Sequence, residues 1–124
     1  MKVKTAELSG VQLDYAVAMS VDHPVKVISG DVCSMHEDGN EWMPYEYFKP
    51  STDWSHCGEL VKPHEVAFAP HPVGRLWRAC ALKAPINNVI EEGETPQIAI
   101  CRAVVASKLG DEVDIPDEMM EVGE

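Results

Sequence analysis

The stretch Thr95–Gly110, which reads TPQIAICRAVVASKLG, decides the fold of this chain. It carries the start and stop signals of an α-helix, because Thr95 is a capping residue, Pro96 takes the first helical position and Gly110 follows the last turn. Its polar interior positions are Gln97, Arg102, Ser107 and Lys108. A helix that is apolar around most of its circumference is buried. The sequence therefore predicts a helix from Pro96 to about Leu109 at the centre of the fold.

A second helix is predicted near the N-terminus. Ser9 and Gln12 have the spacing of a capping box, in which each side chain bonds the backbone of the other residue. Apolar residues at helical spacing follow them. We expect a helix from Gly10 to about Ser20, preceded by a short strand at Lys2–Ala6.

The middle of the chain predicts strands at Val25–Ile28, Asp31–Met35, Glu41–Phe48 and Val73–Lys83. A tight-turn signal, Asp38-Gly39, joins the second and third of these, so we expect them to form a hairpin. Pro44 indicates that the third strand is either an edge strand or a broken one, because proline cannot donate to a ladder. The fourth strand is mostly apolar on both faces, and we expect it to be central and covered on both sides.

Two connecting segments complete the predicted fold. Ser51 or Thr52 is expected to cap a short helical turn that Gly58 stops. The segment Lys62–Pro72 is expected to be an irregular loop, since it holds three prolines and two histidines. Together the elements predict one α+β domain over residues 1–116, with a small antiparallel sheet packed against an N-terminal helix, a short central helical turn and a buried C-terminal helix. Residues 117–124 are expected to be an acidic, flexible tail that folding does not need.

Charge and composition exclude several classes of function. The net charge is −11, and seven of the 21 acidic residues lie from 111 to 124, where there is no base. Nucleic-acid binding needs a basic face, so we expect no direct nucleic-acid ligand. No apolar run approaches the roughly 18 residues of a membrane span, and the first residues lack the apolar core of a signal peptide. We expect a cytoplasmic protein with no membrane partner and with free thiols at its four cysteines.

Three blocks of the sequence are distinctive when taken in order: Met1–Ala18 (MKVKTAELSGVQLDYAVA), Ser51–Ser55 (STDWS) and Glu94–Pro116 (ETPQIAICRAVVASKLGDEVDIP). Together they resemble the NinX-like family of small tailed-phage and prophage proteins, a family without an established function. The last helix is also similar to the C-terminal helix of phage ABA-sandwich domains. The resemblance implies a phage or prophage origin and an α+β sandwich, and it brings no catalytic residues. One departure is at residues 56–59, which read HCGE where a Gln-Gly-Gly-Pro-like run is expected.

The histidines and cysteines suggest two kinds of chemistry. Cys33 and His36 have the spacing of a zinc ligand pair, but the neighbouring His56 and Cys57 are too close in sequence for both to reach one ion. We therefore expect no metal and no cofactor. Cys57, next to His56 and near Asp53, is a candidate nucleophile. Because sequence neighbours seldom face each other as catalysis requires, we expect no catalytic residue.

Two sets of residues are candidates for binding. Asp53, Trp54 and His56 lie together after a turn and could form a polar and aromatic patch. The structural interpretation, in which Trp54 fills the core, is favoured because tryptophan buries a large apolar area. Trp42 and Tyr47 belong to an aromatic-rich segment that serves either core packing or self-association.

Two functions from different classes follow from these observations. The first is a non-enzymatic phage accessory protein that binds a host or phage protein and modulates host physiology or defence. We expect it to form a homodimer by pairing the aromatic edge strand across a two-fold axis. The alternative is a small-molecule-binding protein, or a minor enzyme, with a pocket near Asp53, Trp54 and the His56–His71 loop. A flat aromatic patch would favour the first function, and a deep pocket lined by histidine and aspartate the second.

Overall fold

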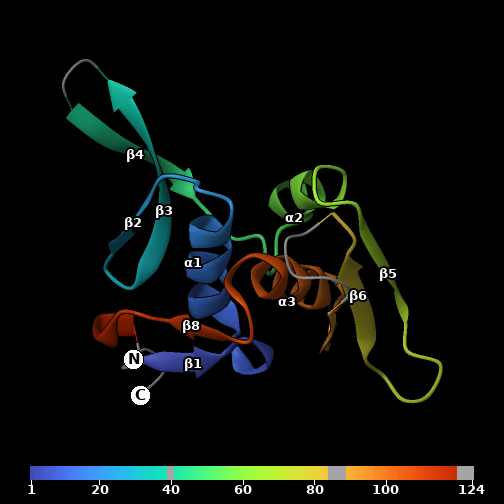
Figure 1. Cartoon of the computed structure of the whole chain (residues 1–124). Helices are drawn as coiled ribbons and strands as arrows, with labels where there is room; N and C mark the ends of the chain where they lie inside the picture. The colour runs from blue at the N-terminus through green and yellow to red at the C-terminus, as the bar shows by residue number, and fades with distance from the viewer. Residues whose placement is uncertain (39–40, 84–88, 120–124) are drawn as a thin grey trace.

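The computed structural model describes residues 1–38, 41–83 and 89–119, which form an α+β fold (Figure 1). In chain order the elements are β1 (Lys2–Lys4), α1 (Gly10–Ser20), β2 (Val25–Ile28), β3 (Asp31–Asp38), β4 (Glu41–Tyr47), α2 (Trp54–Val61), β5 (Val66–Pro70), β6 (Trp77–Ala81), β7 (Ile90–Gly93), α3 (Pro96–Leu109) and β8 (Glu112–Asp114). Short 3₁₀ turns cover Thr5–Glu7 and Asp117–Met119. Within the described ranges, no helix has the length and apolarity needed to cross a bilayer.

Helix α3 has the bounds predicted from the sequence and lies at the centre of the fold (Figure 1). The Thr95 hydroxyl accepts a hydrogen bond of 3.2 Å from the Ile98 backbone N–H, and Gly110 has a positive φ of 89° after the last turn. Two details differ from the predicted pattern. Ser107 is buried, because its hydroxyl donates to the Val104 carbonyl at 2.7 Å and leaves no unpaired polar group, whereas Leu109 is 40% exposed at the helix end.

Helix α1 also has its predicted bounds, and it packs against α3. The predicted capping box is wrong, because the Ser9 side chain makes no capping hydrogen bond. The Gln12 amide instead donates to the Met119 carbonyl at 3.1 Å, so a tertiary contact takes a side chain that the local pattern assigned to the cap. The buried Leu13 and Val17 anchor this helix in the core.

The strands form three small antiparallel sheets rather than the single sheet expected from the sequence. Their orders are β1-β8, β2-β3-β4 and β5-β6-β7. The second sheet packs on α1 and the third on α3, so each has its own helix (Figure 1). Because short strands can bury their apolar faces only where a helix lies close, the two helices divide the strands between them.

The β5-β6-β7 sheet corrects two expectations. Strand β5 lies inside the segment expected to be an irregular loop, where the apolar run from Val66 pairs with β6. Strand β6 is central as predicted but is covered on one face only. Ala79 and Ala81 are buried on the α3 side, whereas Leu82, just beyond the strand, is 54% exposed.

Helix α2 differs from the expected short turn. Asp53, and not Ser51 or Thr52, caps it, since the Asp53 carboxylate accepts the Ser55 backbone N–H at 2.9 Å. The helix continues through Gly58 as far as Val61 because Leu60 and Cys57 bury themselves on its inner side. Tertiary burial therefore outweighs the helix-stopping tendency of glycine.

Strands β3 and β4 form the predicted hairpin, which we call the arm, and its outer part extends beyond the rest of the molecule (Figure 1). The predicted turn residue Gly39 lies outside the described residues. Strand β4 is an edge strand as predicted. The Met35 N–H bonds the Pro24 carbonyl on the β2 side, so Pro44, opposite Met35, turns its nitrogen to the open edge. Proline is tolerated there because no ladder bond is lost.

The C-terminal segment packs on the domain beyond the boundary expected at residue 116. Met119 is fully buried, and the Met1 amino group lies 2.9 Å from the Asp114 carboxylate and 3.2 Å from that of Asp117. Residues 117–119, which were expected to begin the flexible tail, therefore pack against the domain. Residues 120–124 lie outside the described part of the chain, and the division into domain and tail stays a prediction.

Candidate functional site

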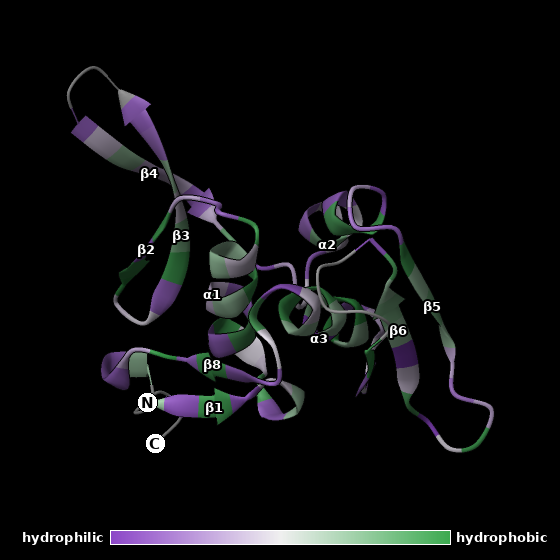
Figure 2. Cartoon of the chain, in the orientation of Figure 1, coloured by the Kyte–Doolittle hydropathy of each residue, from purple (hydrophilic) through white to green (hydrophobic). Residues whose placement is uncertain are grey.

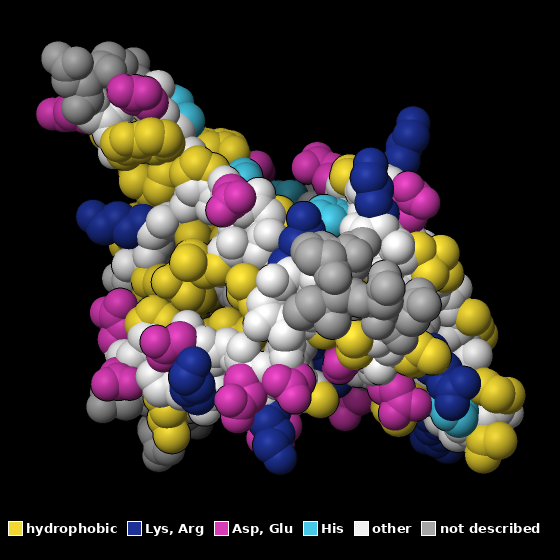
Figure 3. All heavy atoms as spheres, viewed as in Figure 1, with side chains coloured by type: hydrophobic (Ala, Val, Ile, Leu, Met, Phe, Trp, Pro, Cys, Tyr) yellow, Lys and Arg dark blue, Asp and Glu magenta, His cyan; other side chains and the backbone are white. Residues whose placement is uncertain are grey.

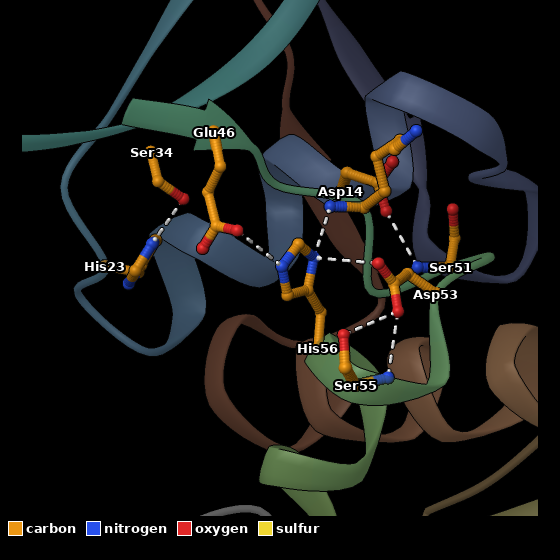
Figure 4. Close-up of polar contacts among 9 residues, drawn as sticks. Asp14, His23, Ser34, Glu46, Ser51, Asp53, Ser55 and His56 are labelled. Atoms are coloured by element: carbon orange, nitrogen blue, oxygen red, sulfur yellow. Dashed lines mark hydrogen bonds and ion pairs between the residues drawn. The ribbon is translucent and has the colours of Figure 1, made fainter. Parts of the chain in front are cut away.

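Polar side chains gather where α1, the end of β4 and the start of α2 meet (Figure 4). Asp14 comes from α1, Glu46 from β4, and Asp53 and His56 from the N-terminal turn of α2. The Asp53 carboxylate is held by the Ser55 backbone N–H at 2.9 Å and by its hydroxyl at 2.6 Å. These hydrogen bonds lower the pKa of Asp53 and keep it charged at the start of the helix.

His56 is the centre of this polar cluster and is mostly buried. Its Nδ1 accepts the Lys49 backbone N–H at 3.0 Å, so the neutral ring carries its proton on Nε2. That Nε2 lies 3.6 Å from a Glu46 carboxylate oxygen, and Nδ1 lies 4.0 Å from Asp53. The backbone donor and the Glu46 carboxylate orient the imidazole and hold the end of β4 to α2 (Figure 4).

Phe48 is buried between two imidazoles. Its ring stacks on His23 at 4.4 Å between centroids and on His56 at 5.5 Å. Burial, and then the charge of His56, lowers the pKa of His23, so His23 is neutral near pH 7. The Ser34 hydroxyl lies 2.9 Å from His23 Nε2, but Ser34 is itself buried. The serine–histidine contact therefore ties β3 to the chain that leaves α1 and is closed to a substrate.

Asp14 is a buried carboxylate inside this cluster. One of its oxygens accepts the Ser51 backbone N–H at 2.8 Å. Burial raises the pKa of Asp14 from 3.8 to about 6, although the hydrogen bond from Ser51 and the charge of His56 oppose the shift. Folding therefore disfavours the charged form of this group.

We expect Asp14→Asn to stabilise the protein at pH 8 and to change little near pH 4. The pKa of Asp14 is higher in the folded than in the unfolded chain, so wild-type stability rises as the pH falls through about 6 towards 3.8. The amide keeps the oxygen that accepts the Ser51 N–H and carries no charge. The gain at pH 8 is at most about 3 kcal/mol, from about two pKa units.

Urea unfolding at both pH values measures this difference. The matched control is the exposed Asp111→Asn, which should change the free energy of unfolding by less than about 0.5 kcal/mol at either pH. An equal gain for Asp14→Asn at pH 8 and pH 4 would contradict the assignment of the cost to the buried charge.

A model of the family described as Bacteriophage P22, NinX, matches residues 4–108 of the chain. The chain belongs to this NinX family. The match covers Lys4–Ala18 of the first block, all of the second and Glu94–Lys108 of the third, and it assigns the family no function. No curated protein matches the chain.

In this NinX family member the five candidate binding residues fall in three places. Asp53 and His56 lie together in the polar cluster, as their spacing suggested. Trp54 points elsewhere, with its ring 6.3 Å from Phe68 of β5, and 47% of it is exposed. The expectation that Trp54 fills the core is wrong, because Cys57 and Leu60 supply the inner face of α2 and the first helical position faces outward. Trp42 and Tyr47 lie on the arm.

The cysteines and histidines of the NinX chain do not converge on one point. Cys57 faces α3, where its thiol meets the Gln97 carbonyl at 4.0 Å, while His56 faces β4. Cys33 and His36 are three residues apart on a strand and so project to opposite faces. Among the described residues, no group of three His, Cys, Asp or Glu side chains could hold a metal ion. The fold therefore does not bring Cys57 and His56 together as a nucleophile and base, nor Cys33 and His36 together as metal ligands.

A cleft of about 840 Å³ opens between β6, β7 and the start of α3. Its lining includes Arg78, Glu91 and Arg102, and it contains none of the five candidate residues. Arg102 is already engaged, since it donates to the Leu8 carbonyl at 3.0 Å and to the Glu92 carbonyl at 2.7 Å. The residues that line the cleft are far apart in the sequence, so no local motif predicted it.

Sequence reasoning also missed Asp14 and Glu46. Asp14 is one acidic residue within a helical pattern, and such residues usually face solvent. Glu46 stands in a strand with other exposed residues. Only the fold brings both carboxylates to His56, so no signal in the sequence could have identified the cluster.

Proposed function

We propose that this NinX family member is a non-enzymatic phage accessory protein that acts in the host cytoplasm. It binds a host or phage protein and so modulates host physiology or defence. The observation that carries the proposal is the arm, where every residue of β4 is exposed. Large hydrophobic side chains stand along it (Figure 3): Trp42 is 54% exposed, Met43 43%, Tyr45 52% and Tyr47 55%.

Such a group of exposed aromatic residues supports a binding role. Tryptophan, tyrosine and methionine are enriched at protein interfaces, and neighbouring exposed apolar residues are uncommon on monomers. Trp42, Pro44 and Tyr47 pair with Glu37, Met35 and Cys33, so these three residues of β4 share one face of the hairpin. The polar cluster fixes the base of β4 through Glu46 and so limits the directions that the arm can take.

A matched pair of variants tests this function. Trp42→Glu places a charge on the arm, and Trp54→Glu places the same charge on a similarly exposed tryptophan of α2. Each immobilised variant is used to capture proteins from infected cells, with the melting temperature as a check on folding. We expect Trp42→Glu to lose the proteins that wild-type retains and Trp54→Glu to keep them. Equal retention by both variants would exclude the arm as the contact surface.

We also propose that two copies of the chain associate through the arm as a symmetric dimer. At micromolar concentration, sedimentation should then approach twice the chain mass of 13.7 kDa. The five acidic residues of one arm repel those of the other arm in the dimer. Because salt screens exposed charges, the fraction of dimer should be larger at 0.5 M than at 0.05 M NaCl.

Tyr47→Glu should shift the protein towards monomer. The same change at Phe48 is unsuitable as a test, because Phe48 is buried between His23 and His56. A protein that stays monomeric at every salt concentration would contradict the proposed dimer.

Small-molecule binding is the second candidate function, and the cleft at Arg78, Glu91 and Arg102 supports it. This position differs from the pocket expected near Asp53, Trp54 and the His56–His71 loop. His71 itself lies beside Arg78, at 2.8 Å between their side-chain nitrogens, and 3.4 Å from a Glu92 carboxylate oxygen. A ligand whose binding is lost in Glu91→Ala and kept in Trp42→Glu would favour this second function.

A further inference from the structure

The arm carries negative charge without cations of its own. Strands β3 and β4 contain Asp31, Glu37, Asp38, Glu41 and Glu46 and neither lysine nor arginine. Glu37 and Glu41 are exposed on the outer part of the arm, whereas Glu46 already faces His56 at its base. Acidic side chains are visible beside the hydrophobic ones at this end of the molecule (Figure 3), and the hairpin is coloured hydrophilic there (Figure 2).

Two lysines lie at the base of the arm. Lys26 of β2 pairs with Cys33, which pairs in turn with Tyr47 of β4. Lys49 follows β4, and its ammonium group lies 5.4 Å from the centre of the Tyr47 ring. The face of Tyr47 therefore already accepts a cation within this chain. The outer residues Glu37, Glu41 and Trp42 have no such neighbour in their strands.

The acidic and aromatic side chains of the arm are interleaved. Trp42 lies opposite Glu37 in the register, so the indole ring and the carboxylate are neighbours on one face. Cations are attracted to the faces of tryptophan and tyrosine, and the planar guanidinium of arginine stacks there while it pairs with carboxylates. A lysine ammonium offers the charge without the stacking plane.

We propose that the arm binds an arginine-rich segment of a partner protein. Guanidinium groups stack on Trp42 and pair with Glu37 opposite it on the same face, and Glu41, which pairs with Asp38, adds negative charge from the other face of the hairpin. The proposal rests on the proposed function, in which the arm is the contact surface, and adds the chemistry of the partner. The proposed dimer would use the same surface, but there the two arms present carboxylates to carboxylates, so an arginine-rich segment is the better complement in charge.

Two labelled peptides test this chemistry: six arginines alternating with glycines, and the same peptide with lysines. Fluorescence anisotropy at 0.05 M NaCl should show the arginine peptide binding about fivefold or more tightly than the lysine peptide, since stacking adds to charge. Trp42→Ala should remove this preference. Failure of the arginine peptide to bind, or equal affinity for both peptides, would overturn the proposal.

A second pair of variants separates the arm from general attraction to an acidic protein. Glu37→Gln with Glu41→Gln, and Glu7→Gln with Glu112→Gln, remove the same charge from exposed positions on and off the arm. We expect the first pair to weaken arginine-peptide binding about tenfold, as for two lost charge contacts, and the second less than twofold. Equal weakening would mean that net charge alone attracts the peptide, and the proposal would fail.

These results are distinguishable from a failure of the proposed function. If Trp42→Glu loses captured proteins but the peptides show no preference, the arm is a contact surface for a partner of other chemistry. If capture does not depend on Trp42, the proposed function itself fails. Melting temperatures within about 2 °C of wild-type show that the exposed substitutions leave the fold intact.

Discussion

Val105→Asp should leave the chain unfolded at 25 °C. Val105 is fully buried on α3, and this helix contacts α1, α2 and the β5-β6-β7 sheet. An aspartate there would lie in an apolar interior without a partner, which costs about 3–5 kcal/mol as an uncompensated charge. The lost apolar contacts of valine add about 1–2 kcal/mol. The folded state of a small domain is stabilised by about 5–15 kcal/mol in total. A loss of about 4–7 kcal/mol therefore equals the whole stability of a domain at the lower end of that range.

Two variants on the same helix serve as controls. Leu109→Asp places the same charge at a residue that is 40% exposed, and we expect it to fold with a loss of about 1 kcal/mol. Val105→Ala keeps the site apolar and should cost about 2 kcal/mol, consistent with a small buried cavity. Circular dichroism and thermal melting measure all three. A Val105→Asp protein with the wild-type spectrum and melting temperature would show that α3 is not the core of the fold.

The two long helices could be predicted because their signals are local. Thr95, Pro96 and Gly110 mark the ends of α3 by their own backbone preferences, whatever the rest of the chain does. The edge position of β4 was predictable for the same reason, since Pro44 carries its restriction with it. The same local logic failed at Ser9, because the cap that it predicts was not formed in the folded chain.

Features that depend on tertiary contacts could not be read from the sequence. Strand β5 forms within a proline-rich segment because β6 lies beside it and Val66 is buried there. Helix α2 passes Gly58 because its inner residues are buried. Trp54 was expected inside, and which side of a helix faces the core depends on what packs against it. The polar cluster joins Asp14 to Ser51, 37 positions away, so its geometry belongs to the fold and not to any motif.

Removal of residues 117–124 should lower the stability by about 3 kcal/mol, contrary to the expectation from the sequence that this segment is dispensable. The physical reason is Met119, a fully buried side chain whose backbone carbonyl accepts the Gln12 amide at 3.1 Å. Deletion of a buried methionine side chain costs about 2–5 kcal/mol. The Asp117 carboxylate also lies near the Met1 amino group, but that pair is exposed and should contribute little.

A second truncation isolates the effect of Met119. A chain that ends at Met119 lacks residues 120–124 but keeps Met119 itself. We expect its melting temperature to stay within about 2 °C of wild-type, whereas the chain that ends at Pro116 falls by about 10 °C or more. Met119→Ala in the full chain should reproduce most of that fall. If both truncations melt like wild-type, Met119 does not stabilise the domain, and the boundary at residue 116 predicted from the sequence stands.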